Sequence, residues 1–225
     1  METAATIIEK LRLVGNEKNL AGMARFGINT QTALGTGIVP VRQIAKTLKR
    51  NHPLALDLWG SGIHEARILA SIIADPKQMT PDLMDEWIKV FNSWDLCDQV
   101  CGNLFCYLPW AYEKVSEWCA REPEFERRAG FSLIAYLAVH DKKAANERFY
   151  PFFDLIEKYA FDERNFVKKA VNWSLRQLGK RNSNDLQTRA VACAKRVQQQ
   201  PHKAARWIAT DALREFEAKK IGLAI

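Results

Sequence analysis

Apolar residues recur at helical intervals along nearly the whole chain. Near the amino terminus, Ile7, Ile8 and Leu11 have the three- and four-residue spacing that places side chains on one face of an α-helix. No segment combines strict apolar/polar alternation with turn residues at both ends, the pattern of a half-buried strand. The chain is therefore predicted to be all-α, with helices at residues 2–13, 17–26, from about Pro40 onward, 53–59, 63–74, 81–91, 94–105, 110–120, 122–139, 146–159, 163–179, 183–199 and 201–219.

Two short patterns recur in the second half of the chain. Phe125-Glu-Arg-Arg-Ala129 returns 41 residues later as Phe166-Val-Lys-Lys-Ala170, and Lys169-Ala-Val-Asn-Trp173 returns 34 residues later as Lys203-Ala-Ala-Arg-Trp207. Periods of this length are typical of paired-helix repeats of the HEAT and armadillo type. We therefore predict a right-handed solenoid of antiparallel helix pairs, forming a single curved domain over residues 1–225.

The second helices of such pairs would line the concave surface of the solenoid. Cations and aromatic rings would then meet in one basic groove, contributed by Arg67, Trp94 with Asp98, Arg128, Lys169 with Trp173, and Lys203. Phosphates attract such cations, while the rings can contact sugars or base edges. The pattern suits a groove that binds a nucleic-acid duplex.

The charge distribution agrees with that interpretation. The formal net charge is +7, and residues 121–225 hold 21 Lys and Arg against 13 Asp and Glu, which leaves −1 for residues 1–120. An excess of this kind is expected of a surface that meets a polyanion, although a solvated basic face without a partner is the common alternative.

Composition limits the class of protein and the cellular compartment that we expect. With 48% hydrophobic and 26% charged residues the chain is globular, and no apolar run approaches the roughly 20 residues of a membrane span. Glu2 and Glu9 interrupt what would be the apolar part of a secretory signal. The cysteines are five in number, and no Cys-x-x-Cys or His-x-x-x-His pair accompanies them. We expect a cytoplasmic monomer without metal or cofactor.

The segment Asn92–Val100 carries the most distinctive chemistry. Trp94 and Asp98 are four residues apart and so share one helical face. Ser93 is a candidate N-cap, and Asp95 falls in the first turn, where the exposed N–H groups favour a negative charge. Asp95 thus has a structural role, whereas Asp98 has none that the sequence reveals. The alternative is that Trp94 belongs to the core and Asp98 is a solvated surface charge.

At this point several stretches together resemble the AlkD-type DNA alkylation repair glycosylases: Leu54–Trp59, His64–Arg67, Ser93–Asp98, Glu126–Ala129 and Lys169–Arg176. The resemblance covers roughly residues 17–210, and its most specific parts are Trp-Asp-x-x-Asp and the later Ala-x-x-Trp-x-x-Arg. It implies a HEAT-like solenoid with a basic concave groove. It also implies hydrolysis of the N-glycosidic bond of cationic alkylated purines, such as 3-methyladenine and 7-methylguanine, while the lesion remains in double-stranded DNA.

Carried over by position, the resemblance implies that Asp98 is the catalytic carboxylate and that Trp94 and Trp173 are cleft tryptophans. It places Arg128 and Arg176 at phosphate-facing positions. Lys169 is also a DNA-binding candidate because of its place in the predicted groove. The sequence departs from the family pattern at Gly37–Pro40 and at Tyr136, which stands in place of a lysine. These two departures leave the DNA contacts of the amino-terminal third open.

The chemistry supports these roles. An alkylated purine already carries positive charge, so it can leave without a general acid, and positive charge develops on the sugar instead. A carboxylate near C1′ stabilises that charge and orients the attacking water. Indole faces attract a cationic base or sugar, each by about 0.5–2 kcal/mol. The competing class is a non-catalytic HEAT-like module that binds DNA or a protein partner, which would gain nothing from a carboxylate in a phosphate-binding groove.

Overall fold

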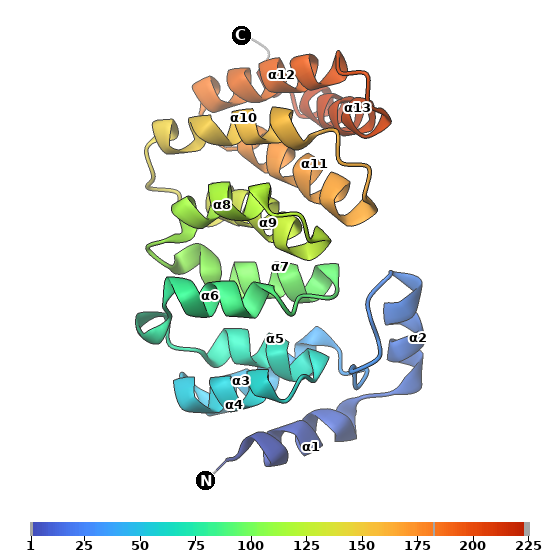
Figure 1. Ribbon diagram of the computed structural model, residues 1–225, viewed down its shortest axis with the longest axis vertical. Helices are drawn as coiled ribbons and strands as arrows, with labels where there is room; N and C mark the ends of the chain where they lie inside the picture. Colours follow the sequence, from blue (N-terminus) through green and yellow to red (C-terminus); the bar gives the residue numbers. More distant parts are fainter. Residues whose placement is uncertain (1, 182, 223–225) are drawn as a thin grey trace. The chain divides into compact units, whose positions relative to one another are not determined.

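The computed structural model describes residues 2–181 and 183–222, and within them the regular structure is entirely helical (Figure 1). The α-helices are α1 Ala4–Val14, α2 Glu17–Arg25, α3 Ile38–Leu48, α4 His52–Gly60, α5 His64–Ile73, α6 Pro81–Ile88, α7 Trp94–Asn103, α8 Ala111–Ala120, α9 Glu124–His140, α10 Tyr150–Tyr159, α11 Asn165–Gly179, α12 Asn184–Gln198 and α13 Lys203–Ala218. Short 3₁₀ turns η1 Pro76–Gln78, η2 Phe105–Tyr107 and η3 Asn146–Phe149 lie between them.

The predicted all-α class is confirmed, and each predicted helix corresponds to one observed. Helix α6 begins as expected, because Thr80 Oγ1 accepts the Leu83 N–H (3.1 Å), Pro81 is the first helical residue, and Asp82 lies in the first turn. Helix α10 is shorter than predicted, since residues 146–149 form the tighter turn η3. The chain divides into two compact units, residues 1–108 and 109–225, and each is described by itself.

The first unit is built on α5, which packs against α3, α4 and α7. Large rings fill the space between α4, α6 and η2: Trp59 and Trp87 stack at 3.8 Å between centroids, and Phe105 lies 6.2 Å from Trp87. All three rings are buried. Burial of one such side chain stabilises the fold by about 1.5–3 kcal/mol, so these rings fix α6 to its neighbours.

The loop between α2 and α3 is held by a buried acid. Glu65, on α5, accepts the Leu34 N–H at Oε2 (2.8 Å) and the Thr36 N–H at Oε1 (3.0 Å). Thr36 Oγ1 in turn donates to the Leu11 carbonyl oxygen (2.6 Å). These bonds satisfy buried backbone donors and tie the loop to α1 and α5, so the loop has a defined path although it contains no helix.

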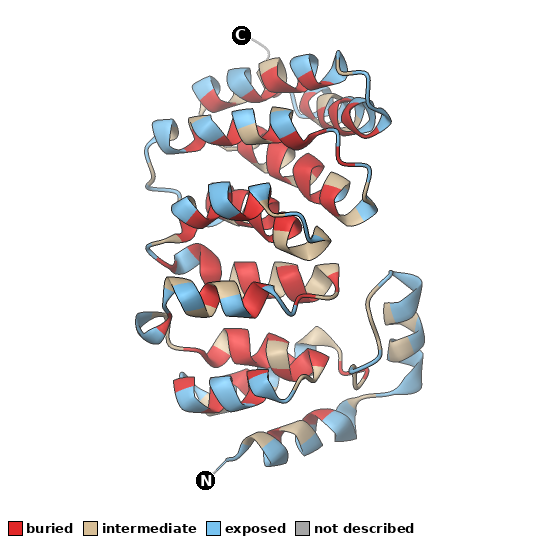
Figure 2. Ribbon diagram, viewed as in Figure 1, coloured by how far each residue is buried: buried red, intermediate tan, exposed pale blue. Residues whose placement is uncertain are grey.

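In the second unit α9 packs against α8 and α11, and α11 packs against α13, so the second helices of successive pairs lie next to one another. The repeated sequences occupy matching places in this stack. Phe125 at the start of α9 and Phe166 at the start of α11 are in contact, with centroids 5.6 Å apart. The buried stripes in Figure 2 follow the sides of the helices that face their neighbours.

A buried ion cluster joins the start of α9 to the segment before α11. Arg127 Nη1 lies 2.8 Å from Asp162 Oδ2, and Arg164 Nη2 lies 2.5 Å from the same oxygen. Burial by itself would raise the pKa of Asp162, but hydrogen bonds from Arg164 and Arg127 outweigh it and hold that pKa below its usual 3.8. Asp162 is therefore an ionised anchor between successive repeats.

All five cysteines are buried and carry free thiols: Cys97, Cys101, Cys106, Cys119 and Cys193. Their side chains act as small apolar groups in the helix packing.

Candidate nucleic-acid interface and active site

Helix α7 presents the central candidate residues from its first two turns. Its first residue is Trp94, and Ser93 occupies the N-cap position with extended backbone angles, as predicted. The Ser93 side chain makes no capping bond, however; it is fully buried, and its Oγ lies 3.4 Å from Asn92 Oδ1. The helix start is therefore fixed by packing and not by a side-chain cap.

Asp95 lies in the first turn of α7, as predicted, and its side chain has a partner that the sequence did not reveal. Asp95 Oδ2 lies 2.8 Å from Nε2 of His64, the first residue of α5, whose side chain is 2% exposed. The other oxygen, Oδ1, is buried without a hydrogen-bond partner among the described residues. The two residues are 31 positions apart in the chain, which explains why sequence spacing gave no sign of this pair.

Trp94 and Asp98 share one face of the helix start, next to Asp95. Both are half-buried, and their four-residue separation puts them one turn apart. Trp94 Nε1 donates to the Phe26 carbonyl oxygen at the end of α2 (3.0 Å), which fixes the indole edge. A ring and a carboxylate on one partly exposed face can together attract a cationic group.

Arg67, another residue expected at the groove, belongs to the same unit. It is half-buried, with Nε donating to the Trp59 carbonyl oxygen (3.4 Å) and Cζ 5.5 Å from the Trp59 ring centroid. Burial lowers the pKa of Arg67 below its usual range. Part of the hydrogen-bonding capacity of its guanidinium is therefore used by a residue of α4.

Trp173 lies in the middle of α11 and is half-buried. Its ring meets Tyr136 of α9 edge-to-face, with centroids 5.1 Å apart and planes at 85°. Tyr136 also stacks on His140 at 5.8 Å. The residue that departs from the expected lysine therefore supports the candidate tryptophan instead of adding charge.

The three predicted DNA-binding cations differ in their surroundings. Lys169 is exposed on α11, one turn before Trp173. Arg128 is only 5% exposed and donates from Nη1 to the Phe166 carbonyl oxygen (2.5 Å), so the structure uses it between α9 and α11. The Arg128 side chain is therefore buried between two helices and is not solvated, and its predicted phosphate contact stays a prediction.

Arg176 is engaged by acidic residues of α13. Its Nε pairs with Glu215, and its Nη1 lies 3.4 Å from Asp211 Oδ2. Burial alone would raise the pKa of Glu215, but the hydrogen bond from Arg176 lowers it below its usual value. A phosphate would have to compete with these carboxylates for Arg176, a cost that the sequence did not show.

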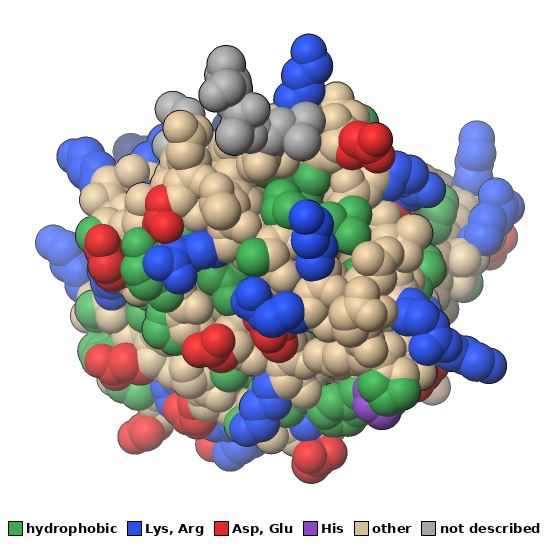
Figure 3. Space-filling view, turned by 90° about the horizontal axis from the view of Figure 1, so that it is seen from above, with side chains coloured by type: hydrophobic (Ala, Val, Ile, Leu, Met, Phe, Trp, Pro, Cys, Tyr) green, Lys and Arg blue, Asp and Glu red, His purple; other side chains and the backbone are tan. Residues whose placement is uncertain are grey.

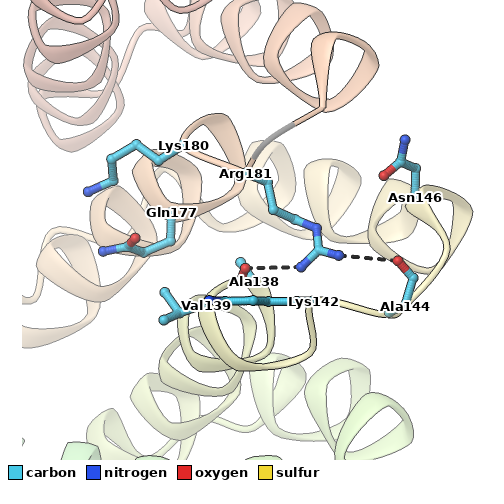
Figure 4. Close-up of a pocket in the computed structure, with 8 residues that line it drawn as sticks. All are labelled: Ala138, Val139, Lys142, Ala144, Asn146, Gln177, Lys180 and Arg181. Atoms are coloured by element: carbon cyan, nitrogen blue, oxygen red, sulfur yellow. Dashed lines mark hydrogen bonds between the residues drawn. The ribbon is translucent and has the colours of Figure 1, made fainter.

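A hollow of about 610 Å³ lies beside the carboxyl ends of α9 and α11 (Figure 4). Its cations are Lys142, Lys180 and Arg181. Arg181 donates to the carbonyl oxygens of Ala138 (3.1 Å) and Ala144 (3.1 Å), and Lys180 lies 3.3 Å from Glu215. Two of its three cations thus have internal partners, which makes it a weak candidate for an anion site.

Lys and Arg side chains project widely from the face that carries α12 and α13, with Asp and Glu among them (Figure 3). Within residues 2–181 and 183–222 no cluster of three or more His, Cys, Asp or Glu has the arrangement of a metal site. In the same residues no helix has the length and apolar character needed to cross a membrane.

The six predicted site residues are distributed over both units. Trp94 and Asp98 belong to residues 1–108, and Arg128, Lys169, Trp173 and Arg176 belong to residues 109–225. Inside each unit the structure brings the candidate residues to successive turns or neighbouring helices. Their convergence in one groove stays a prediction.

Comparisons with known proteins agree with this architecture. The profile of a protein family described as DNA alkylation repair enzyme matches residues 7–216. No curated protein matches the chain. One similar solved structure represents a new family of proteins related to the HEAT-like repeat DNA glycosylases with affinity for branched DNA structures; it has a TM-score of 0.81 and 23% sequence identity, over 98% of this chain and 97% of that one. At this identity the likeness establishes a HEAT-like repeat fold.

Proposed function

Because this chain belongs to the DNA alkylation repair enzyme family, we propose that it is a DNA glycosylase that hydrolyses the N-glycosidic bond of cationic alkylated purines in double-stranded DNA. The substrates would be lesions such as 3-methyladenine and 7-methylguanine. The products would be the free base and an abasic site, formed without a metal or cofactor.

The observation that carries this proposal is the arrangement of two carboxylates on α7. Both are half-buried, but Asp95 is paired with buried His64, whereas Asp98 shares a helical face with Trp94. A protein that only binds phosphates would lose affinity by placing a carboxylate where the phosphates bind, because like charges repel. A glycosylase needs that carboxylate, because charge develops on the sugar as the bond breaks.

In the proposed reaction the alkylated purine leaves with the bonding electron pair and becomes neutral. The sugar acquires oxocarbenium character, which Asp98 stabilises electrostatically, and a water attacks C1′ with Asp98 orienting it and accepting its proton. Trp94 and Trp173 add cation–π attraction of about 0.5–2 kcal/mol each. No group has to protonate the departing base.

The deciding experiment measures release of free base from methylated duplex DNA in the presence of a chelator. The wild-type protein should release 3-methyladenine and 7-methylguanine, and Asp98→Asn should lose most of that activity while it retains DNA binding. Asp82→Asn, at an exposed position in the first turn of α6, is the matched control and should be fully active. Equal activity in the Asp98 and Asp82 variants would refute the catalytic role of Asp98.

A second candidate function is binding of branched DNA without excision. One observation favours it: the similar structure represents proteins with affinity for branched DNA. This alternative predicts that the protein binds a three-way junction more tightly than a duplex of equal length and releases no base. The same preparation can be tested for both properties.

A further inference from the structure

The first unit contains a long stretch without acidic residues. Residues 18–56 include no Asp or Glu but six Lys and Arg, although residues 1–108 as a whole hold eleven cations and eleven anions. Four of the six cations fall between Arg42 and Arg50. Neutrality of the unit therefore conceals a local concentration of positive charge at α3.

These four cations surround one open hollow of about 500 Å³. Arg42 and Lys46 project from successive turns of α3, and Lys49 and Arg50 follow the end of that helix. Ala45 of α3, Ile72 of α5 and Asn103, the last residue of α7, also line it. We call this feature the α3 basic hollow.

Local bonds hold the hollow in shape. Arg50 Nη1 donates to the Ala74 carbonyl oxygen at the end of α5 (3.1 Å), and Asn103 Nδ2 donates to Ser71 Oγ (3.1 Å). Lys49 adopts a left-handed conformation (φ 53°) that turns the chain between α3 and α4. The cations therefore stand on a fixed backbone and not on a loop without contacts.

The charges in the hollow have little compensation from the protein, since Arg50 has only a longer-range attraction to Asp75. Among the described residues, no carboxylate forms an ion pair with Arg42, Lys46, Lys49 or Arg50, in contrast to Arg176 and Lys180 of the second unit. Four cations around one hollow repel one another, and a bound polyanion would relieve that repulsion.

We propose that the α3 basic hollow binds backbone phosphates of the DNA that flanks the lesion. From Arg42 to the end of α3 at Leu48 the helix extends over about 9 Å at 1.5 Å per residue, which corresponds to roughly two to three phosphates of one strand at 3.4 Å each, and Lys49 and Arg50 follow directly. The partner follows from the proposed function, since it is the DNA that the family acts on.

Helix α7 links this hollow to the candidate catalytic pair. Asn103 lies five residues beyond Asp98, about 7.5 Å along the helix axis, which corresponds to roughly two base-pair steps. The hollow would thus hold DNA close to the lesion without contacting the damaged base. It is a positioning site for the backbone and not part of the reaction.

The test uses the double variant Arg42→Gln/Lys46→Gln in the full chain. The control is Lys18→Gln/Lys77→Gln, which removes the same charge from exposed positions of the same unit outside the hollow. Binding to a lesion-containing duplex is measured from 50 to 200 mM NaCl, with circular dichroism to verify folding. Base release by the wild-type protein is measured on the same duplex.

Loss of two phosphate contacts should reduce the slope of log affinity against log salt by about 1.8 in the Arg42/Lys46 variant. Between 50 and 200 mM salt, the wild-type affinity would then fall about 12-fold more than that of the variant. An unchanged slope, or an equal reduction in the control, would overturn the proposal. Selective loss of binding to a polyglutamate peptide, with DNA binding intact, would likewise overturn it by identifying an acidic protein as the partner.

The outcome is separable from the proposed catalysis. If the wild-type protein releases no base but the Arg42/Lys46 variant still loses salt dependence, the glycosylase proposal fails and the phosphate site stands. If the wild-type protein releases base and the variant has an unchanged slope, the glycosylase proposal stands and the phosphate site is refuted.

Discussion

At the scale of single residues, neighbouring side chains of one type do different work. Asp95 and Asp98 are three positions apart on α7, yet Asp95 meets a histidine that is 2% exposed while Asp98 is half-buried beside Trp94. The same residue type is thus placed in two different environments within one turn of the helix. Trp94 shows the same division within one side chain, because its N–H contacts Phe26 while its ring shares a face with Asp98.

Substitutions at Trp94 can separate these two parts. Trp94→Phe keeps a ring but removes the donor to the Phe26 carbonyl oxygen, and should cost at most about 1 kcal/mol because that bond is near solvent. Trp94→Ala removes the ring and should lower base release much further than Trp94→Phe. Thermal unfolding and base release are measured together. If Trp94→Ala destabilises the protein by about 3–5 kcal/mol, the ring is a core residue instead.

The choice of leaving group tests Asp98 as a carboxylate without an accompanying acid. It stabilises a cation but cannot protonate a neutral purine as it departs. Release of 3-methyladenine and 7-methylguanine should therefore be efficient, and release of hypoxanthine or ethenoadenine poor, in parallel assays on matched duplexes. Efficient hypoxanthine release would contradict the proposed mechanism.

At the scale of helices, the stack of the second unit is fastened by polar groups between repeats. Arg127 and Arg164 converge on Asp162, and Arg128 reaches the Phe166 carbonyl oxygen at the start of α11. Removal of one member of a buried pair leaves the other charge without compensation, which typically costs about 3–5 kcal/mol. These contacts therefore hold successive helix pairs in register.

The Asp162 cluster should make stability sensitive to acid. The folded-state pKa of Asp162 is depressed, so its stabilising contribution is complete above about pH 3.8 and is lost as the pH falls through the lower folded value. Asp162→Asn should be less stable at neutral pH and should lose less stability on acidification. Denaturant unfolding at pH 7 and near pH 3 measures both effects; parallel pH profiles for the two proteins would rule out this role.

The sequence predicted helices well because their signals are local. Apolar spacing and the Thr80-Pro81-Asp82 start are contained within a few residues. The environments of Arg128 and Arg176 were not predictable in this way, because their partners Phe166 and Glu215 lie 38 and 39 positions away. The three 3₁₀ turns have no apolar period of their own, and the Asp95–His64 contact depends on how α5 meets α7.

At the scale of the whole molecule, positive charge is divided unequally. Residues 109–225 hold 22 Lys and Arg against 15 Asp and Glu and so carry the entire net +7, whereas residues 1–108 are neutral with one basic hollow. DNA affinity should therefore depend on many weak phosphate contacts in the second unit and a few localised ones in the first. Salt dependence measures the sum of both.

Lys169 and Lys203 test the contribution of the second unit. Both are exposed and occupy corresponding repeat positions on α11 and α13. Replacing either one with Gln should reduce the salt slope of duplex binding by about 0.9, because one phosphate contact is lost. Lys143→Gln, an exposed residue between α9 and α10, is a control for general charge loss. If the Lys169 and Lys203 variants change the salt slope no more than the Lys143 variant does, DNA does not contact α11 and α13 at these positions.

The reactivity of the buried thiols can be used to measure local opening of the helices around them. Burial raises the pKa of Cys106 to about 12, and it raises the pKa of Cys119 and Cys193 as well. Since the thiolate is the reactive form, labelling reagents should modify these groups only when the surrounding helices separate. Cys106 reports on residues 1–108, and Cys119 and Cys193 on residues 109–225. Labelling followed by peptide mass analysis, with and without DNA, would give an opening rate for each half of the chain and show which half the nucleic acid protects.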